Sequence, residues 1–351
     1  DSYNTAVGFN SGGAVTTGQY NTLLGGEAGD ALTTGNSNVA IGYFALSAED
    51  AHGLNVAVGS RALANQNAGA NAYNVAVGPD AGLSVTTGVQ NTLLGGLAGD
   101  ALTAAGFNVA IGYGALGADT LGSKSVAVGH NNLRSQNFTT ATNSFNTAIG
   151  HGAGLDVTTG IQNTLIGGLA GDALTDADFN VAVGHATLSS DTLGTQSTAL
   201  GYSALASQNF TTATESHNTA VGYIAGNGVT TGTLTTLIGS LAGYRLTTGN
   251  LNTAVGYAAL SAETKGDRSV AIGVNALTNQ NNTTNTDAYN VAVGLAAGSS
   301  VSTGVRNTLI GSLTGEAVTT GSENTCLGYA AGDAITTGSN NIIIGQSVDR
   351  D

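Results

Sequence analysis

Short apolar segments that end in glycine recur along the whole chain and set its hydrophobic pattern. The segment Asn4–Gly8 reads Asn-Thr-Ala-Val-Gly, and related segments follow at Asn21–Gly25 and Asn38–Gly42 and continue to Gly345. The closing glycines are 17 residues apart, except that every fourth interval lengthens to 19 or 21. A fixed period of this length is typical of stacked repeats. The pattern therefore predicts twenty coils in groups of four.

Two columns of this repeat have a clear physical meaning. The closing position is glycine in all twenty coils, as expected where the backbone needs a positive φ or a very close approach. Asparagine stands four residues earlier in sixteen coils and predicts a ladder of amide hydrogen bonds between coils. In the first three coils these structural positions are Gly8, Gly25, Gly42, Asn4, Asn21 and Asn38.

Each coil has room for two very short strands and two tight turns. The sequence therefore predicts an all-β fold, a parallel β-solenoid of the β-roll type, with coils about 4.8 Å apart and a rod of about 95 Å. We expect one repeat domain over 1–351. Its super-repeats of four coils are 4–73, 74–145, 146–217, 218–289 and 290–351.

Both faces of the predicted strands are apolar, although side chains alternate between the faces. The residue before the closing glycine is always Val, Ile or Leu, and we assign it to the interior. The preceding residue is nearly always Ala or Leu, with Cys326 and Ile343 as late exceptions, and we assign it to the outer face. An exposed alanine row suits close approach by a neighbouring chain. The sequence thus predicts a parallel homotrimer, with a single-chain solenoid as the alternative.

The ends of the chain leave two alternatives open. Neither end encodes the capping element that solenoids need, and the chain opens at Asp1 without a methionine. We expect either a longer fibre from which this chain comes or subunits that stack end to end into a filament.

Composition narrows the function further. The chain has 54 glycines but is 41% hydrophobic, which argues against disorder. The net charge is −14 with only eight lysines and arginines, so nucleic acid is not an expected partner. No apolar run reaches the roughly 18 residues of a membrane span. The lone Cys326 excludes an intrachain disulfide framework.

Side chains that could carry chemistry are arranged as ladders. Tyr and His share the column after the closing glycine and predict stacked exposed rings. The acidic column of Asp30, Asp100 and Asp172 recurs every four coils, about 19 Å apart, too far to share a cation. No nucleophile motif organises Ser, His and Asp. We predict no enzyme activity, no catalytic residue, no cofactor and no metal.

The fourth coil of each group carries the extra residues. These insertions lengthen one turn and are expected to project as a row, and loops on rigid scaffolds commonly carry recognition. The alternatives are contact with a neighbouring chain, a glycan or a host receptor, or an insertion that is merely tolerated. The candidate contact residues are Asn137, Phe138, Thr139, Asn209, Phe210, Thr211, Asn281, Asn282 and Thr283. Their three asparagines before Phe or Asn also begin Asn-x-Thr sequons.

Threonine pairs offer one alternative function. The pairs Thr16-Thr17, Thr86-Thr87 and Thr158-Thr159 could order water on an ice-binding face. The third and fourth coils replace the pair with other residues, which would interrupt such a face.

Two kinds of segment carry a family resemblance. Ser125–Gly129 (Ser-Val-Ala-Val-Gly) and Ser269–Gly273 resemble head repeats of trimeric autotransporter adhesins. Asn252–Tyr257 (Asn-Thr-Ala-Val-Gly-Tyr) and Asn340–Gly345 resemble repeats of phage tail fibres. The resemblance covers the chain and implies a left-handed, trimeric β-roll without shared catalytic residues. We expect an extracellular structural or adhesive fibre on a virion, on a cell or in a secreted filament.

Overall fold

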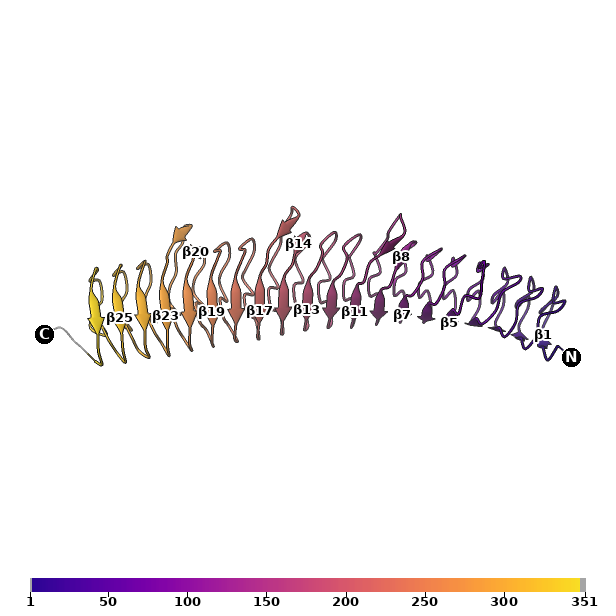
Figure 1. Cartoon of the computed structure of the whole chain (residues 1–351), viewed down its shortest axis with the longest axis horizontal. Coiled ribbons are helices and arrows are strands. Elements are labelled where there is room, and N and C mark those ends of the chain that lie inside the picture. Colours follow the sequence, from indigo (N-terminus) through magenta and orange to yellow (C-terminus); the bar gives the residue numbers. More distant parts are fainter. Residues whose placement is uncertain (1, 348–351) are drawn as a thin grey trace. The chain divides into compact units, whose positions relative to one another are not determined.

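The computed structural model describes residues 2–347, and these form strands, turns and bends without any helix. The chain divides into two compact units, Asp1–Asp178 and Phe179–Asp351. Each unit is a parallel β-solenoid in which every coil contributes one strand to a main row (Figure 1). The predicted fold class is confirmed, with the 17-residue spacing between most coils. The part of the last super-repeat after residue 347 lies outside the described residues.

The main row consists of three-residue strands that pair in parallel with their neighbours. In the first unit they are β1 (Thr5–Val7), β2 (Thr22–Leu24), β3 (Val39–Ile41), β4 (Val56–Val58), β5 (Val75–Val77), β6 (Thr92–Leu94), β7 (Val109–Ile111), β9 (Val126–Val128), β11 (Thr147–Ile149) and β12 (Thr164–Ile166). In the second unit they are β13 (Val181–Val183), β15 (Thr198–Leu200), β17 (Thr219–Val221), β18 (Thr236–Ile238), β19 (Thr253–Val255), β21 (Val270–Ile272), β23 (Val291–Val293), β24 (Thr308–Ile310), β25 (Thr325–Leu327) and β26 (Ile342–Ile344).

Six two-residue strands form separate parallel pairs at the opposite end of some coils. In the first unit β8 (Gly122–Ser123) pairs with β10 (Thr142–Asn143). In the second unit β14 (Gly194–Thr195) pairs with β16 (Thr214–Glu215), and β20 (Gly266–Asp267) pairs with β22 (Thr286–Asp287). Each pair joins the third coil of a super-repeat to the fourth-coil insertion (Figure 1).

Register is fixed because equivalent columns meet. Thr5 lies opposite Thr22, and Val7 lies opposite Leu24. The strand ends at the closing glycine, where Gly8 has a φ of 138°. A Cβ there would lie 2.3 Å from the carbonyl oxygen of Gly25. Both the backbone conformation and the close approach of the next coil therefore require glycine.

The strand faces are the reverse of those expected from the sequence. The middle residue of the strand points into the coil and is buried, as at Ala40 and Ala76, while the residues beside it point outward. Val77 and Ile149 keep 39% and 38% of their surface exposed. The assignment of the Val/Ile/Leu row to the interior, and of the alanine row to an outward trimer face, is therefore wrong. The interior is narrow and close-packed, so most strands fit only a small side chain at their centre.

Large and small side chains are matched across this interior. Positions are counted from the closing glycine, so the strand occupies −3 to −1. In the second coil of a super-repeat Leu93 fills position −2, and a Cβ on Gly99 at position +4 would lie 2.9 Å from it. In the next coil Ala110 stands at −2, and Leu116 at +4 fills the space. The type of coil therefore decides whether the large buried side chain stands at position −2 or at position +4.

The turns use the left-handed backbone region at residues other than glycine. Gln90 at position −5 and Leu97 at position +2 both have a φ of 57°, and the buried Leu116 at position +4 has a φ of 52°. Such a conformation costs an ordinary residue about 1–2 kcal/mol in isolation. Here the stacked neighbours fix the same conformation in every coil, so hydrogen bonds between coils offset that cost.

Candidate functional site

A buried carboxylate lies beneath the insertion of the second super-repeat. Asp119, at position +7 of the third coil, accepts hydrogen bonds from Gln136 Nε2 at 2.5 Å, Gly122 N at 2.9 Å and Phe138 N at 3.2 Å. The Oε1 atom of Gln136 accepts a further bond of 2.8 Å from Asn146 Nδ2. The side chains of Asp119, Gln136 and Asn146 are fully buried. A buried charge is tolerated here because it is surrounded by donors.

Three other super-repeats carry the same acid–Gln–Asn network. Their distances, acid to Gln and then Gln to Asn, are 3.2 and 2.8 Å for Glu49–Gln66–Asn74, 2.6 and 2.9 Å for Asp191–Gln208–Asn218, and 2.7 and 2.8 Å for Glu263–Gln280–Asn290. Our sequence analysis missed these networks. A signal was present, because in these four super-repeats position +7 is Val or Leu in the first two coils, acidic in the third and Gln in the fourth.

The insertions project less than the sequence predicted. Phe138 and Phe210 are only 6% and 5% exposed, and Asn282 is also buried. The expectation that these three residues present themselves to a partner is therefore wrong. Each folds back over the buried carboxylate, and its backbone N–H donates to that carboxylate. These hydrogen bonds to the buried acid explain why the three side chains are buried.

The exposed part of the insertions is small and polar. Thr139, Thr211 and Thr283 lie on the surface, as do Asn137 and Asn209, whereas Asn281 is half-buried. Each of these asparagines accepts a hydrogen bond from a third-coil threonine, at 3.0 Å for Asn137, 3.2 Å for Asn209 and 3.0 Å for Asn281. The surface available for contact is therefore threonine-rich and tied to the preceding coil.

The first super-repeat replaces one glycine of this arrangement with histidine. His52 stands where Gly122, Gly194 and Gly266 stand in the other networks, and Ala68 stands where Phe138 stands. A Cβ on Gly122 would lie 2.1 Å from Asp119 Oδ2 and 2.8 Å from the ring of Phe138. The smaller Ala68 removes the second of these obstacles, and Glu49 stands in place of Asp119.

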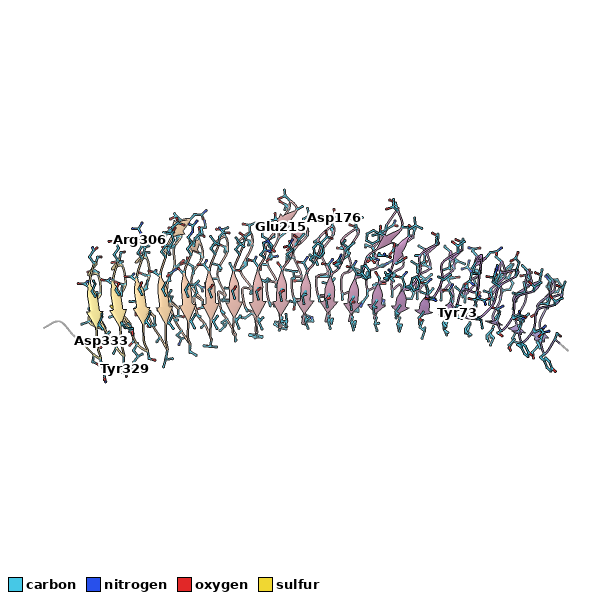
Figure 2. All side chains as sticks on the ribbon, in the orientation of Figure 1. Tyr73, Asp176, Glu215, Arg306, Tyr329 and Asp333 are labelled. Carbon is cyan, nitrogen blue, oxygen red and sulfur yellow. The ribbon has the colours of Figure 1, made fainter. Side chains whose placement is uncertain are left out.

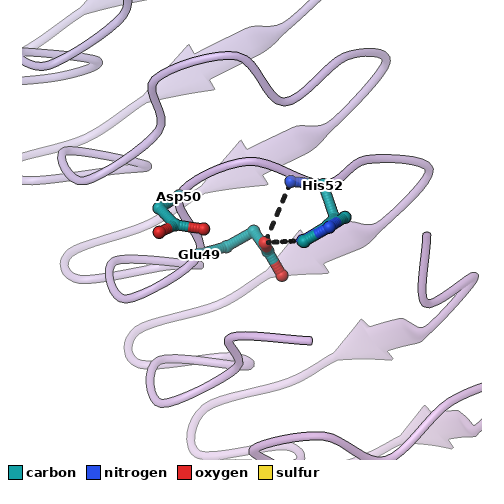
Figure 3. A group of neighbouring side chains, drawn as sticks. All are labelled: Glu49, Asp50 and His52. Carbon is teal, nitrogen blue, oxygen red and sulfur yellow. Dashed lines mark hydrogen bonds and ion pairs between the residues drawn. The ribbon is translucent and has the colours of Figure 1, made fainter. Parts of the chain in front are cut away.

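His52 forms a small polar group with two acids. One ligand atom each from Glu49, Asp50 and His52 lies within 4.8 Å of the others, a spacing that could hold a metal ion. Glu49 Oε1 is 3.4 Å from His52 Nδ1 and accepts a hydrogen bond of 3.1 Å from His52 N, while Asp50 lies to one side (Figure 3). The other carboxylate oxygen of Glu49, Oε2, accepts hydrogen bonds from Gln66 Nε2 and from the backbone N–H of Ala68. Both oxygens of Glu49 are thus already engaged by the turn and the insertion.

Burial raises the pKa of several carboxyl groups, among them Asp119 and Asp100. It raises the pKa of the Asp119 carboxyl, against the opposing effect of its hydrogen bonds to Gln136 and the backbone. Burial also raises the pKa of Asp100, while a backbone hydrogen bond and the nearby Arg134 act in the other direction. Asp100 belongs to the acidic column of Asp30, Asp100 and Asp172.

The ladders of aromatic side chains are present. Tyr113, His130 and His151 stack with ring centroids 5.6 and 5.3 Å apart. In the second unit His185, Tyr202 and Tyr223 stack in the same way, at 5.6 and 5.5 Å. The histidines therefore lie in a column of rings along the solenoid, each in contact with a neighbour from the next coil.

The asparagine ladder bonds mainly to the backbone. Asn21 N donates to Asn4 Oδ1 at 2.8 Å, and Asn38 N donates to Asn21 Oδ1 at 2.9 Å. The Nδ2 groups of Asn4 and Asn21 reach the carbonyls of Gly18 and Gly35 at 2.7 and 2.8 Å. The ladder joins successive coils and closes each turn.

The threonine pairs are exposed but partly engaged. Thr16 Oγ1 donates to the carbonyl of Thr33 at 3.1 Å, and Thr230 Oγ1 donates to that of Thr247 at 3.2 Å. These hydroxyl donors serve the contact between coils.

Shallow hollows open beside the third coil of some super-repeats. The first is about 500 Å³ and is lined by residues that include Asp30, Tyr43, Ser47 and Arg61. The second is about 210 Å³ and is lined by residues that include Asp100, Tyr113, Gly117 and Arg134. A third, in the second unit, is about 440 Å³ and has no acidic residue in its lining, which includes Leu241, Tyr244, Arg245 and Ser261. All three share the same columns of the repeat.

In each unit the outward side of the main row is an uncharged and largely apolar surface, which we call the sheet face. It consists of positions −3 and −1 of every strand, filled by Thr, Val, Ile and Leu, and none of the main-row strands contains a charged residue. Exposed residues at positions −5 and +1 border it on its two sides, represented in Figure 2 by Arg306 and Tyr329. Charged residues on the −5 border are paired, for example Lys124 with the ring of Phe145 at 5.1 Å.

Comparison with known proteins gives no family. No protein-family model matches the chain, and no curated protein matches it in sequence. Within residues 2–347 there is also no helix of the length and apolarity that a bilayer crossing requires.

Proposed function

We propose that this protein is a non-catalytic structural fibre protein that associates in parallel with copies of itself through the sheet face. The observation that carries the proposal is the exposure of an uncharged apolar surface that repeats in every coil. Monomeric soluble proteins rarely leave a contiguous apolar patch of more than a few hundred Å² uncovered. The net charge of −14 resides in other columns of the repeat.

The repeat itself favours a second copy of the chain as the partner. Rows of Val, Ile and Leu recur with the strand spacing of about 4.8 Å. Only a partner with the same spacing can pack against these rows along their length, and an identical chain in parallel provides it. The trimeric state is the one implied by the resemblance to fibre repeats, and closed cyclic symmetry would cover every sheet face.

An extracellular location and an adhesive role belong to the same proposal. A fibre on a virion, on a cell or in a secreted filament would expose the insertion threonines and the hollows to surfaces in its surroundings. Ice binding is the less favoured alternative, because the fourth coils and nearly all third coils replace the threonine pair with other residues, which interrupts an ice-binding face. A thermal-hysteresis measurement would detect it.

Sedimentation equilibrium of the purified chain tests the proposal. We expect a mass three times 34.3 kDa for the wild type. The substitution Ile149→Lys places a charge on the sheet face and should give monomers. Thr87→Lys, at an exposed turn position outside the sheet face, is the matched control and should leave the trimer intact. A wild-type monomer at micromolar concentration would refute the association, and a dimer would change only the stoichiometry.

A further inference from the structure

We propose that the two acid-walled hollows, at Asp30 and Asp100, are binding sites for neutral saccharides. The inference rests on the proposed function in that it names a ligand for the fibre surface. The hollows, however, are formed by other columns of the repeat than the sheet face. The sheet face precedes the closing glycine, whereas nearly all of the hollow lining lies after it. The hollows can therefore stay open when the sheet face is covered.

The floor of each hollow comes from small residues of the third coil. Ser47 and Ala48 form it in the first hollow, and Gly117 and Ala118 form it in the second. On the flanking coils, position +5 is Asp30 and Ala64 beside the first hollow, and Asp100 and Arg134 beside the second. A charged side chain therefore stands next to the floor of each hollow.

The walls offer both an acceptor and a donor. In the first hollow Asp30 comes from the second coil and Arg61 from the fourth, so the third-coil floor lies between them. Asp30 Oδ1 is buried and accepts no hydrogen bond from the described residues. Arg61 is held by Asp80, with 2.8 Å between Arg61 Nε and Asp80 Oδ1. A buried acceptor without a donor is costly, and a ligand hydroxyl or amide N–H would satisfy it.

An aromatic ring completes each hollow. Tyr43 lines the first and is 55% exposed, and Tyr113 lines the second and is about equally exposed. Tyrosine combines an apolar ring with a polar tip, and so it contacts ligands that have both apolar and polar surface.

These features together select the ligand class. An anion would meet the carboxylate, and a cation would meet the guanidinium. A neutral ligand with many hydroxyls supplies donors to Asp30, acceptors to Arg61 and C–H groups to the tyrosine ring. Sugar rings have this chemistry, and hollows of a few hundred Å³ are of the size that binds small ligands.

The repeat adds a second property. Equivalent columns of the two hollows are four coils apart, about 19 Å at strand spacing. A polysaccharide could reach both at once, and the second contact would then be intramolecular. We therefore expect a long saccharide to bind at least tenfold more tightly than a tetrasaccharide of the same sugar.

Calorimetric titration of the whole chain tests the proposal with three neutral probes: maltotetraose, cellotetraose and tetra-N-acetylchitotetraose. We expect at least one to bind with a millimolar or lower Kd. Asp30→Asn combined with Asp100→Asn should weaken binding at least tenfold, as should Tyr43→Ala combined with Tyr113→Ala. The controls are Glu215→Gln, an exposed acid, and Tyr223→Ala, which is 57% exposed, and neither residue lines any of the three hollows.

Two outcomes would overturn the saccharide sites. One is that none of the three probes binds, and the other is that the paired substitutions leave binding unchanged. Measuring mass on the same samples separates this proposal from the fibre. A trimer that binds no probe refutes the hollows alone, and a monomer that binds one refutes the association alone.

Discussion

The first two coils of a super-repeat and the last two fill the same narrow interior in different ways. In the second super-repeat, Leu93 at position −2 and Leu102 at position +7 make a dry interior around Gly99. In the following two coils Leu116 moves the bulk to position +4, and Asp119 and Gln136 make position +7 polar. The backbone path and the strand register are nevertheless the same.

This difference shows that the 17-residue period and the fourth-coil insertions depend on different residues. The dry coils show that apolar packing is sufficient to build a coil of 17 residues. The polar coils occur where the chain departs from that length, because the carboxylate accepts N–H groups that the widened turn would otherwise leave unpaired. The buried acid therefore fixes the insertion by accepting its backbone N–H. The glutamine donates a hydrogen bond to the acid and accepts one from the asparagine.

The largest expected effect comes from exchanging the two packing arrangements. Leu93→Ala alone leaves a cavity and should cost about 2–5 kcal/mol of unfolding free energy. Gly99→Leu alone overpacks the interior and adds left-handed strain, and should cost about 2–4 kcal/mol. The double variant has the third-coil residues at positions −2 and +4, with Leu102 still at +7, and should cost at least ~1 kcal/mol less than the sum. Denaturant unfolding measures all three, and simple additivity would show that the two positions do not share space.

A second test removes one member of the polar network. Gln136→Leu takes a donor from the buried Asp119 carboxylate and should cost about 2–3 kcal/mol. Adding Asp119→Val, so that both positions resemble the dry coils, should recover at least ~1 kcal/mol, because the unpaired charge is gone. Denaturant unfolding again measures the difference. If the double variant is less stable than Gln136→Leu, the carboxylate holds the insertion more strongly than we infer.

A third test compares the first super-repeat with the second. Ala68→Phe restores the ring found at position 138 but leaves His52 in its way, and should cost about 1–3 kcal/mol. His52→Gly in the same chain should restore most of that stability. Thermal melting of the two variants checks this prediction. The idea fails if Ala68→Phe is tolerated equally well with and without His52.

The smallest effect concerns pH. Burial raises the pKa of Asp119 above the 3.8 of an ordinary aspartate, so the folded chain holds this proton more tightly than the unfolded chain does. Stability is therefore lost as the pH rises from about 3.8 through the raised pKa, and it is regained on acidification. Relative to Asp119→Asn, the wild type should gain stability as the pH falls from 7 towards 4. Calorimetric melts that show no difference between the two proteins would contradict this.

Much of the fold could be predicted from the sequence, because the repeated residues determine the backbone conformation of each coil. A glycine in every coil marks where the strand ends, and Gly8 is needed both for its φ of 138° and for the approach of Gly25. In-register pairing then follows, because equivalent positions of neighbouring coils lie opposite each other. The turns were harder, because residues such as Gln90 and Leu116 adopt left-handed conformations that their side chains do not favour.

The sequence by itself determined the period, the parallel stacking and the four-coil grouping, since these depend only on which residues recur at fixed spacing. Only the tertiary structure decided which face of each strand is inside. A strand such as Val75–Val77 is apolar on both faces, so alternation cannot choose between them. The choice depends on what lies across the interior, where a leucine leaves room only for alanine. The same proximity of distant positions buries Phe138 over Asp119 and places Asp30 beside Tyr43, contacts that no local pattern contains.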